Sequence, residues 1–187
     1  MYGECRRPAQ ENDPEIPMSP YGVAKLASEK YIKAYSALYG LTHTIFRYSN
    51  VYGPRQDPHG EAGVVAIFSE KLLRREAPFI YGNGRQTRDF VFVGDVAQAN
   101  CLALSRGKNE VVNIGTGKLT SVLKLYQAMA RITKFSAPPI FKPARKGELY
   151  RSVLNIFYAK EAISWTPKNS LQSGLEKTID YFRNKSE

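Results

Sequence analysis

The stretch S-P-Y-G-V-A-K at residues 19–25 constrains the fold most, because it specifies where a long helix begins. Ser19 is a good helix N-cap, and Pro20 suits the first helical position, where an N–H would have no helical partner. The pattern then continues to about Tyr39, and Gly40 supplies a C-terminal stop. The sequence therefore predicts a helix over residues 20–39.

This predicted helix has two distinct faces. Tyr21 and Lys25 are four residues apart and share one face. An apolar stripe on a different face consists of Val23, Ala27, Tyr31, Ala34 and Leu38. We expect the stripe to pack on a core while the phenol and the ammonium face a cleft.

A tyrosine and a lysine one helical turn apart have a chemical use. A free phenol has a pKa of about 10, too high for a good base at neutral pH, and a nearby ammonium lowers it. Such a tyrosine can take a proton from a sugar hydroxyl while a hydride leaves the same carbon. The alternative is a surface Tyr and Lys that are neighbours by chance, and the motif alone favours that alternative.

Composition bounds the class of protein. The chain has 187 residues, enough for one domain or one and a half, and it is 43% hydrophobic and 24% charged, as globular proteins are. It has no apolar run long enough to span a bilayer and no signal-peptide pattern, so we expect no membrane partner. Cys101, one of two cysteines, lies in an apolar helical pattern and is predicted to be a buried thiol, which indicates a cytoplasmic protein.

The net charge of +10 has two interpretations. Nucleic-acid binding is one, but the Lys and Arg residues are scattered and no recognition motif is present. A cleft for an anionic small molecule, with a solvated basic surface, is the interpretation we prefer. His43 and His59 lack companions at metal-ligand spacing, so no metal site is predicted.

Helical and strand patterns alternate along the chain. Strands are predicted at 41–48, 78–81, 88–93, 110–114 and 139–142, and helices at 64–75, 95–105, 121–133, 157–164 and 171–183. Asp95 is expected to cap its helix, with Gln98 completing a capping box. Residues 49–63 are predicted to form a long loop. The segment N-I-G-T-G at 113–117 is predicted to form a tight turn rather than a phosphate-binding loop. The order of elements predicts an α/β fold.

Several blocks together resemble one family. They are M-Y-G-E, S-P-Y-G-V-A-K, F-R-Y-S-N-V-Y-G-P-R-Q-D-P, G-E-A-G-V-V-A-I-F, I-Y-G-N-G-R-Q-T-R-D-F-V-F-V-G-D-V-A, N-I-G-T-G and R-K-G-E-L, in this order over nearly the whole chain. The chain is similar to NAD-dependent nucleotide-sugar epimerases of the UDP-glucose 4-epimerase type, within the extended short-chain dehydrogenase/reductase superfamily. This resemblance favours the interpretation of Tyr21 and Lys25 as a catalytic pair over that of surface residues that are neighbours by chance.

The resemblance implies a role for each matched residue. Tyr21 would be the catalytic base and would also contact NAD. Lys25 would hydrogen-bond the nicotinamide ribose of NAD and lower the pKa of Tyr21, and Tyr48 and Val51 would lie beside the nicotinamide. The remaining positions would bind a UDP-sugar: the diphosphate at Asn50, Arg88 and Arg145, the uracil between Val64 and Tyr81, a ribose hydroxyl at Glu148, and the hexose C2 substituent near Ser152. A homodimer, formed through the Tyr21 helix and the helix that precedes it in relatives, is expected for the complete protein.

Four of the substrate positions also have a purely structural interpretation. Arg88 could be a solvated strand residue and Tyr81 part of the core. Asn50 could cap a turn, and Arg145 could be surface charge in K-P-A-R-K. Asn155 stands where the family usually has Asp before a short helix, and since Asn also caps helices, the fold should tolerate it.

The sequence departs from the family pattern in one large respect. The glycine-rich dinucleotide fingerprint and the first βαβ unit are not found in it. We therefore expect a C-terminal portion of an epimerase: residues 1–58 as the remainder of a Rossmann domain, and 59–187 mainly a small α/β substrate domain, with 88–115 returning to the Rossmann core. The 187 residues alone are expected to be inactive. A non-catalytic sugar-nucleotide-binding fragment, or a related NDP-sugar dehydratase or decarboxylase, is the alternative.

Overall fold

The computed structural model describes residues 1–4, 6–59 and 63–185. Its helices are α1 (Pro20–Tyr39), α2 (Val64–Leu73), α3 (Val93–Ala103), α4 (Val122–Thr133), α5 (Phe157–Ile163) and α6 (Leu171–Lys185). Its strands are β1 (Thr44–Tyr48), β2 (Asn50–Tyr52), β3 (Phe79–Tyr81), β4 (Thr87–Arg88), β5 (Phe90–Phe92), β6 (Glu110–Ile114), β7 (Thr120–Ser121), β8 (Ile140–Lys142) and β9 (Arg151–Ser152).

The strands pair mostly in parallel across long stretches of chain. β1 pairs with β6, β2 with β5, and β3 with β8, all in parallel. β4 lies between β7, which is antiparallel to it, and β9, which is parallel to it. Parallel pairs joined by helices are the pattern of an α/β fold, as predicted.

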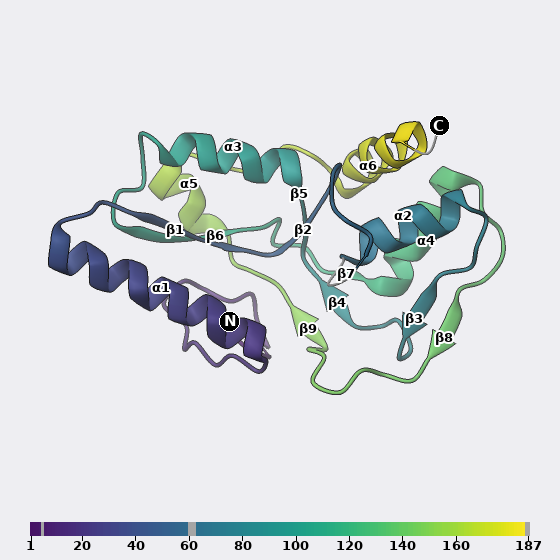
Figure 1. Ribbon diagram of the computed structural model, residues 1–187, viewed down its shortest axis with the longest axis horizontal. Helices are drawn as coiled ribbons and strands as arrows, with labels where there is room; N and C mark the ends of the chain where they lie inside the picture. Colours follow the sequence, from purple (N-terminus) through teal and green to yellow (C-terminus); the bar gives the residue numbers. More distant parts are fainter. Residues whose placement is uncertain (5, 60–62, 186–187) are drawn as a thin grey trace.

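Figure 1 shows α2, α4 and α6 in one group and α3 and α5 in another, and each group packs around an apolar cluster. The larger cluster joins α2, α4 and α6 to β3 and β5. The smaller cluster packs α3 and α5 against β6 and includes the buried Trp165. Trp165 Nε1 donates to the carbonyl of Asp95 at 2.9 Å, which attaches the chain after α5 to α3.

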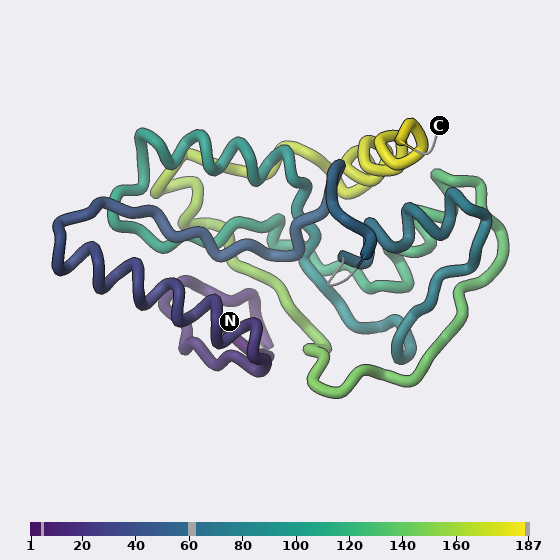
Figure 2. The backbone as a smooth tube through the Cα atoms, in the orientation of Figure 1, coloured from purple at the N-terminus to yellow at the C-terminus, as the bar shows by residue number. Residues whose placement is uncertain are grey.

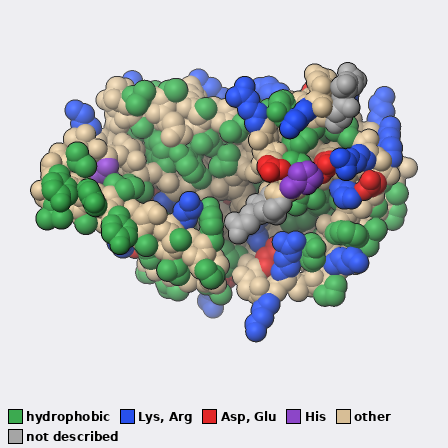
Figure 3. All heavy atoms as spheres, viewed as in Figure 1, with side chains coloured by type: hydrophobic (Ala, Val, Ile, Leu, Met, Phe, Trp, Pro, Cys, Tyr) green, Lys and Arg blue, Asp and Glu red, His purple; other side chains and the backbone are tan. Residues whose placement is uncertain are grey.

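Helix α1 begins and ends as the sequence predicts. The Ser19 hydroxyl accepts from the backbone N–H of Gly22 at 3.2 Å, and Gly40 ends the helix at φ 68°. The expectation that the apolar stripe packs on the core is wrong. Tyr31 and Leu38 are exposed, and apolar side chains cover the outer side of α1 in Figure 3. The buried residues of α1 are Gly22 and Glu29 instead.

Glu29 is buried because it belongs to a polar network. Arg47 on β1 donates from Nε and Nη2 to the two oxygens of Glu29, at 2.9 and 2.7 Å. Its other donors reach the Tyr2 hydroxyl, the Glu11 carbonyl and the Glu15 carboxylate. The amino-terminal segment, which loops beside the first half of α1 in Figure 2, is thereby fixed to β1 and α1.

Three further expectations are corrected. Residues 50–52, within the predicted loop, form β2, because they hydrogen-bond to β5. The predicted strand at 88–93 divides into β4 and β5, and α3 begins at Val93. Asp95 therefore lies inside the first turn of α3 and caps nothing, since its carboxylate accepts from the backbone and side-chain nitrogens of Asn169.

Cys101 is exposed rather than buried. The reason is that α3 turns a different set of residues toward the core, among them Val96 and Ala99. The other cysteine, Cys5, lies outside the described residues. Among the described residues, no helix is both long enough and apolar enough to cross a bilayer.

Candidate functional site

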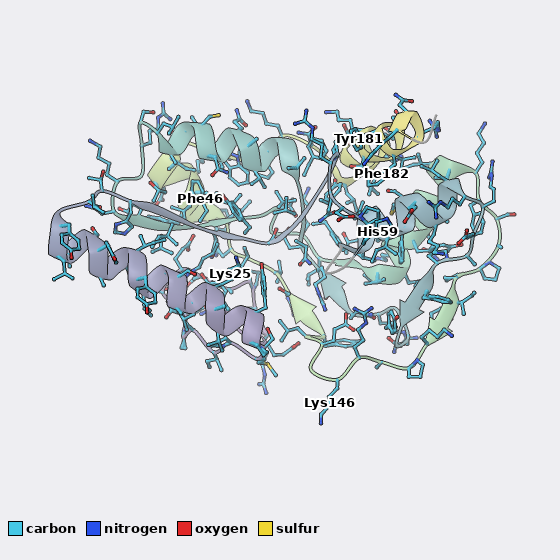
Figure 4. All side chains as sticks on the ribbon, viewed as in Figure 1. Lys25, Phe46, His59, Lys146, Tyr181 and Phe182 are labelled. Atoms are coloured by element: carbon cyan, nitrogen blue, oxygen red, sulfur yellow. The ribbon has the colours of Figure 1, made fainter. Side chains whose placement is uncertain are left out.

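Tyr21 and Lys25 stand on the first turns of α1, beside its buried face. Tyr21 is 64% exposed, and the Lys25 ammonium lies 5.3 Å from the centroid of the Tyr21 ring. Lys25 is labelled in Figure 4. Helix α1 runs back alongside β1, so its amino-terminal end lies toward the carboxyl end of β1 (Figure 1). The structure thus brings the predicted pair together at an accessible position.

The carboxyl end of β1 carries the next group of predicted residues. The Tyr48 hydroxyl donates to Asn100 Oδ1 on α3 at 3.1 Å, while its ring is 43% exposed. Asn50 is exposed at the start of β2, and Val51 is half-buried against the smaller cluster. Ligands of open α/β sheets bind beyond the carboxyl ends of parallel strands, which is where these residues lie.

Arg88 and Glu148 form an ion pair from β4 to the loop before β9. Arg88 Nη2 donates to Glu148 Oε1 at 3.1 Å. Burial lowers the pKa of the Arg88 guanidinium, and the carboxylates of Glu148 and Glu4 oppose that shift. Ser152 on β9 is the register partner of Arg88. Arg88 is therefore a half-buried cation that lies beside Glu148 and Ser152, and not a solvated edge residue.

Arg145 and Tyr81 form a second contact in the same region. The Arg145 guanidinium lies 3.9 Å from the centroid of the half-buried Tyr81 ring, a cation–π arrangement. Val64 begins α2 and packs in part against the larger cluster. Within the described part of the chain, no hydrogen bond or ion pair connects Tyr21 or Lys25 to these substrate positions.

Asp89 lies among the predicted substrate residues, although the sequence did not single it out. It is buried, and its carboxylate accepts from the backbone N–H and hydroxyl of Thr116 and from the N–H of Gly117, at 2.8, 2.6 and 3.0 Å. Burial raises the pKa of Asp89, and these hydrogen bonds work against that rise. The N-I-G-T-G segment is thus a tight turn closed on Asp89, as predicted, because its donors are already occupied.

The backbone of Asp89 connects the predicted substrate residues. Its N–H donates to the carbonyl of Ser152 at 3.0 Å, and its carbonyl accepts from the N–H of Asn50 at 2.9 Å. A β-carbon on Gly115 would lie 2.6 Å from the Asp89 carboxylate, so this approach requires glycine. In the sequence, Asp89 is marked only by its position beside Arg88, within a block that resembles the epimerase family.

The exposed groups fit one end of a dinucleotide. A phenol, an ammonium and a second exposed aromatic ring at the end of a parallel strand suit a nicotinamide and its ribose. The sequence contains no G-x-x-G-x-x-G turn that would hold the dinucleotide diphosphate. In the described ranges, no group of three or more His, Cys, Asp or Glu side chains is arranged to hold a metal ion.

Comparison with known proteins gives a consistent result. Residues 1–115 match the family model of the NAD dependent epimerase/dehydratase family. A relative from Mycolicibacterium smegmatis, a UDP-glucose 4-epimerase, is 46% identical over 181 residues, which are 96% of this chain and 58% of the relative. The chain spans about 60% of the length of the curated relatives it matches.

Solved structures agree on the fold. The Thermotoga maritima UDP-glucose 4-epimerase, determined with UDP-glucose, has a TM-score of 0.97 and 49% identity, covering 100% of this chain and 61% of its own. The Methanobrevibacter ruminantium UDP-N-acetylglucosamine 4-epimerase, in complex with UDP-N-acetylmuramic acid, has a TM-score of 0.93 and 32% identity, covering 98% and 60%. The predicted fold class, part of a Rossmann-like α/β fold, is confirmed.

Proposed function

The chain belongs to the NAD dependent epimerase/dehydratase family, and from that membership we propose that it forms part of an NAD-dependent UDP-sugar 4-epimerase. The observation that carries the proposal is the exposed Tyr21–Lys25 pair at the start of α1. This end of α1 lies toward the carboxyl end of β1, where the strand ends at Tyr48 (Figure 1). UDP-glucose and UDP-galactose are the proposed substrate and product, by analogy with the relatives.

Each residue near the reacting carbon has a proposed task. Tyr21 Oη takes the proton from the sugar C4 hydroxyl, and returns it after the sugar has rotated to present its other face. Lys25 donates to the nicotinamide ribose and keeps a positive charge beside the phenol. Tyr48 and Val51 flank the nicotinamide. When bound, NAD supplies the acceptor for the hydride at C4.

The UDP-sugar binds across β4 and the loop before β9 in this proposal. Arg88 and Arg145 hold the diphosphate with their fork-shaped donors, and Asn50 contributes an amide. The uracil lies between Val64 and Tyr81, and Glu148 accepts from a ribose hydroxyl. The ion pair of Arg88 with Glu148 and the stacking of Arg145 on Tyr81 support this assignment, because they gather the four side chains in one region.

Ser152 is proposed to admit a substituent at the hexose C2 position. Its side chain is small and half-buried on β9, directly beside Arg88 in register. A small residue leaves room for an acetamido group, so UDP-N-acetylglucosamine is proposed as a second substrate. Pocket size alone changes selectivity by about 1–3 kcal/mol, which gives a preference rather than an absolute switch.

A homodimer of the complete protein is proposed through α1. Val23, Tyr31, Tyr35 and Leu38 are exposed on this helix. Figure 3 shows hydrophobic side chains on the surface of the part of the molecule that α1 occupies in Figure 1. Exposed apolar surface of this kind marks an interface. No nucleic-acid or membrane partner is proposed.

The two-part division of the chain is also a proposal. Residues 1–58 and 88–115 would belong to the Rossmann part, and the rest of 59–187 mainly to the substrate part. The packing of α5 against α3 and β6 supports adding residues 157–165 to the Rossmann part. The 187 residues alone are proposed to be inactive, because their sequence lacks a turn for the NAD diphosphate.

Turnover distinguishes an epimerase from a sugar-nucleotide-binding fragment. The complete protein, supplied with NAD and UDP-glucose, should form UDP-galactose, and Tyr21→Phe should lower kcat by at least about a hundredfold while retaining UDP binding. Binding of UDP without any turnover by the wild type would favour the non-catalytic alternative. A 4-keto or decarboxylated product would favour a dehydratase or decarboxylase.

A further inference from the structure

Glu4, in the amino-terminal segment, holds the beginning of β9 through its side chain. Glu4 Oε2 accepts from the backbone N–H of Tyr150 at 3.0 Å, and Oε1 accepts from that of Arg151 at 2.9 Å. Successive N–H groups that converge on one anion form a nest, and bonds to a carboxylate are stronger than neutral ones. One exposed side chain therefore connects two segments about 146 residues apart.

The same peptide is held from its other side by β4. The Tyr150 carbonyl accepts from the Thr87 N–H at 2.8 Å, and Arg151 is the register partner of Thr87. Farther along, Ala9 pairs with Leu154, and its N–H donates to the Val153 carbonyl at 3.0 Å. The amino-terminal segment thus follows residues 150–155, and Glu4 is its contact nearest to the loop before β9.

That loop has little packing of its own. Residues 143–148 are exposed, and Lys146 at the loop tip points away from the body of the protein (Figure 4). Arg145 and Glu148, which are proposed to bind the nucleotide, lie in it. Apart from the contacts of Arg145 with Tyr81 and of Glu148 with Arg88, their positions depend on how the loop is attached at its two ends, β8 and β9.

Glu4 is close to the charges of the proposed diphosphate site without occupying it. Its carboxylate acts electrostatically on Arg88, whose side chain also faces Glu148. Both oxygens of Glu4 accept from backbone N–H groups, whereas Arg88 donates from Nη2 to Glu148 and from Nη1 to the carbonyl of Thr87. A phosphate oxygen can therefore take the place of Glu148 without first displacing Glu4.

We propose that Glu4 is a positioning residue for the sugar-nucleotide site: it fixes the loop of residues 143–150 so that Arg145, Glu148 and Ser152 converge with Arg88 on one ligand. The inference rests on the proposed function and adds a residue to its binding site. Because Tyr21 and Lys25 belong to α1, removing the Glu4 contacts weakens nucleotide binding and leaves the proton-transfer pair in place.

Two variants of Glu4 test the inference. Glu4→Gln keeps the shape but replaces one acceptor by an NH2 group, and Glu4→Ala removes both acceptors. Glu76→Gln, at an exposed carboxylate that pairs with Lys71, is the matched control. The substitutions are made in the complete protein, because the 187 residues alone are proposed to be inactive. Calorimetric titration with UDP, kinetics with UDP-glucose and NAD, and hydrogen exchange of the Tyr150 and Arg151 amides are measured on each variant.

We expect Glu4→Gln to raise the Kd of UDP and the KM of UDP-glucose about tenfold, with kcat within about twofold of the wild type. The two amides should exchange faster, and Glu76→Gln should behave as the wild type. If the wild type binds UDP and both Glu4 variants bind it with the same Kd, the inference about Glu4 is wrong while the proposed function stands. Absence of UDP binding by the wild type would overturn the proposed function and, with it, the ligand assigned here.

Discussion

The Glu29–Arg47 pair predicts a large loss of stability when the carboxylate is removed. In Glu29→Gln, the bidentate contact of Arg47 is broken while the guanidinium, whose side chain is only 5% exposed, stays buried. Removing one partner of a buried ion pair typically costs about 3–5 kcal/mol, because the remaining charge has lost its compensation. Since Glu15 still contacts Arg47, we expect the lower end of that range.

The pKa of Glu29 gives a second measure of the same interaction. Burial alone would raise this pKa, but hydrogen bonds and charges from Arg47 and Lys33 outweigh it and lower the pKa from 4.5 to about 2. A shift of this size corresponds to about 3 kcal/mol of stability above pH 5. A carboxylate whose pKa is lowered by folding stabilises the protein fully at pH values above its pKa in the unfolded chain. This contribution to the free energy of unfolding is lost as the pH falls through the pKa of the folded state.

Urea unfolding of the wild type and Glu29→Gln between pH 7 and pH 2 measures both effects. The variant should be less stable by about 3 kcal/mol at pH 7, and the difference should narrow as the pH falls from about 5 to about 2. Glu70→Gln is the control: it breaks the Arg74–Glu70 pair at the end of α2, in which the Arg74 side chain is 62% exposed, and should cost less than about 1 kcal/mol. A Glu29→Gln effect as small as the control, or one independent of pH, would refute the reasoning.

Three further predictions concern other parts of the protein. Asp89→Asn should lower the free energy of unfolding by about 1–3 kcal/mol in urea titrations, because one oxygen that accepts from the 115–117 turn is lost. Ser152→Tyr should reduce kcat/KM for UDP-N-acetylglucosamine more than for UDP-glucose, and an unchanged ratio would place Ser152 away from the pocket. Leu38→Glu should convert a dimer of the complete protein into a monomer in light scattering, and a persisting dimer would move the interface away from this face of α1.

Elements with strong local signals were predictable from the sequence. The bounds of α1 follow from Ser19, Pro20 and Gly40, each of which acts on its own neighbourhood, and β6 was predicted with its observed bounds. The short strands β2, β4, β7 and β9 have only two or three residues, too few for a period of two to be seen. They exist because of partners far along the chain.

Tertiary contacts explain the other differences between the prediction from the sequence and the structure. Amphipathicity shows which residues of α1 are apolar but not what covers them, and the face turned to the protein is chosen by the contact of Glu29 with Arg47. The proposed site residues came from a resemblance, which aligns sequence blocks and says nothing about the contacts of Glu4 or Asp89. Those contacts join segments 27 to 147 residues apart, so no local pattern predicts them.

The fate of the hydrogen on C4 of the sugar tests the central claim most directly. The complete protein is incubated with NAD and UDP-glucose in deuterium oxide, and the products are examined by proton NMR and mass spectrometry. A hydride held within the site does not exchange with solvent, whereas a proton on the Tyr21 oxygen does. The proposed function therefore predicts UDP-galactose that retains protium at C4. Deuterium at C4, or no UDP-galactose at all, would contradict it.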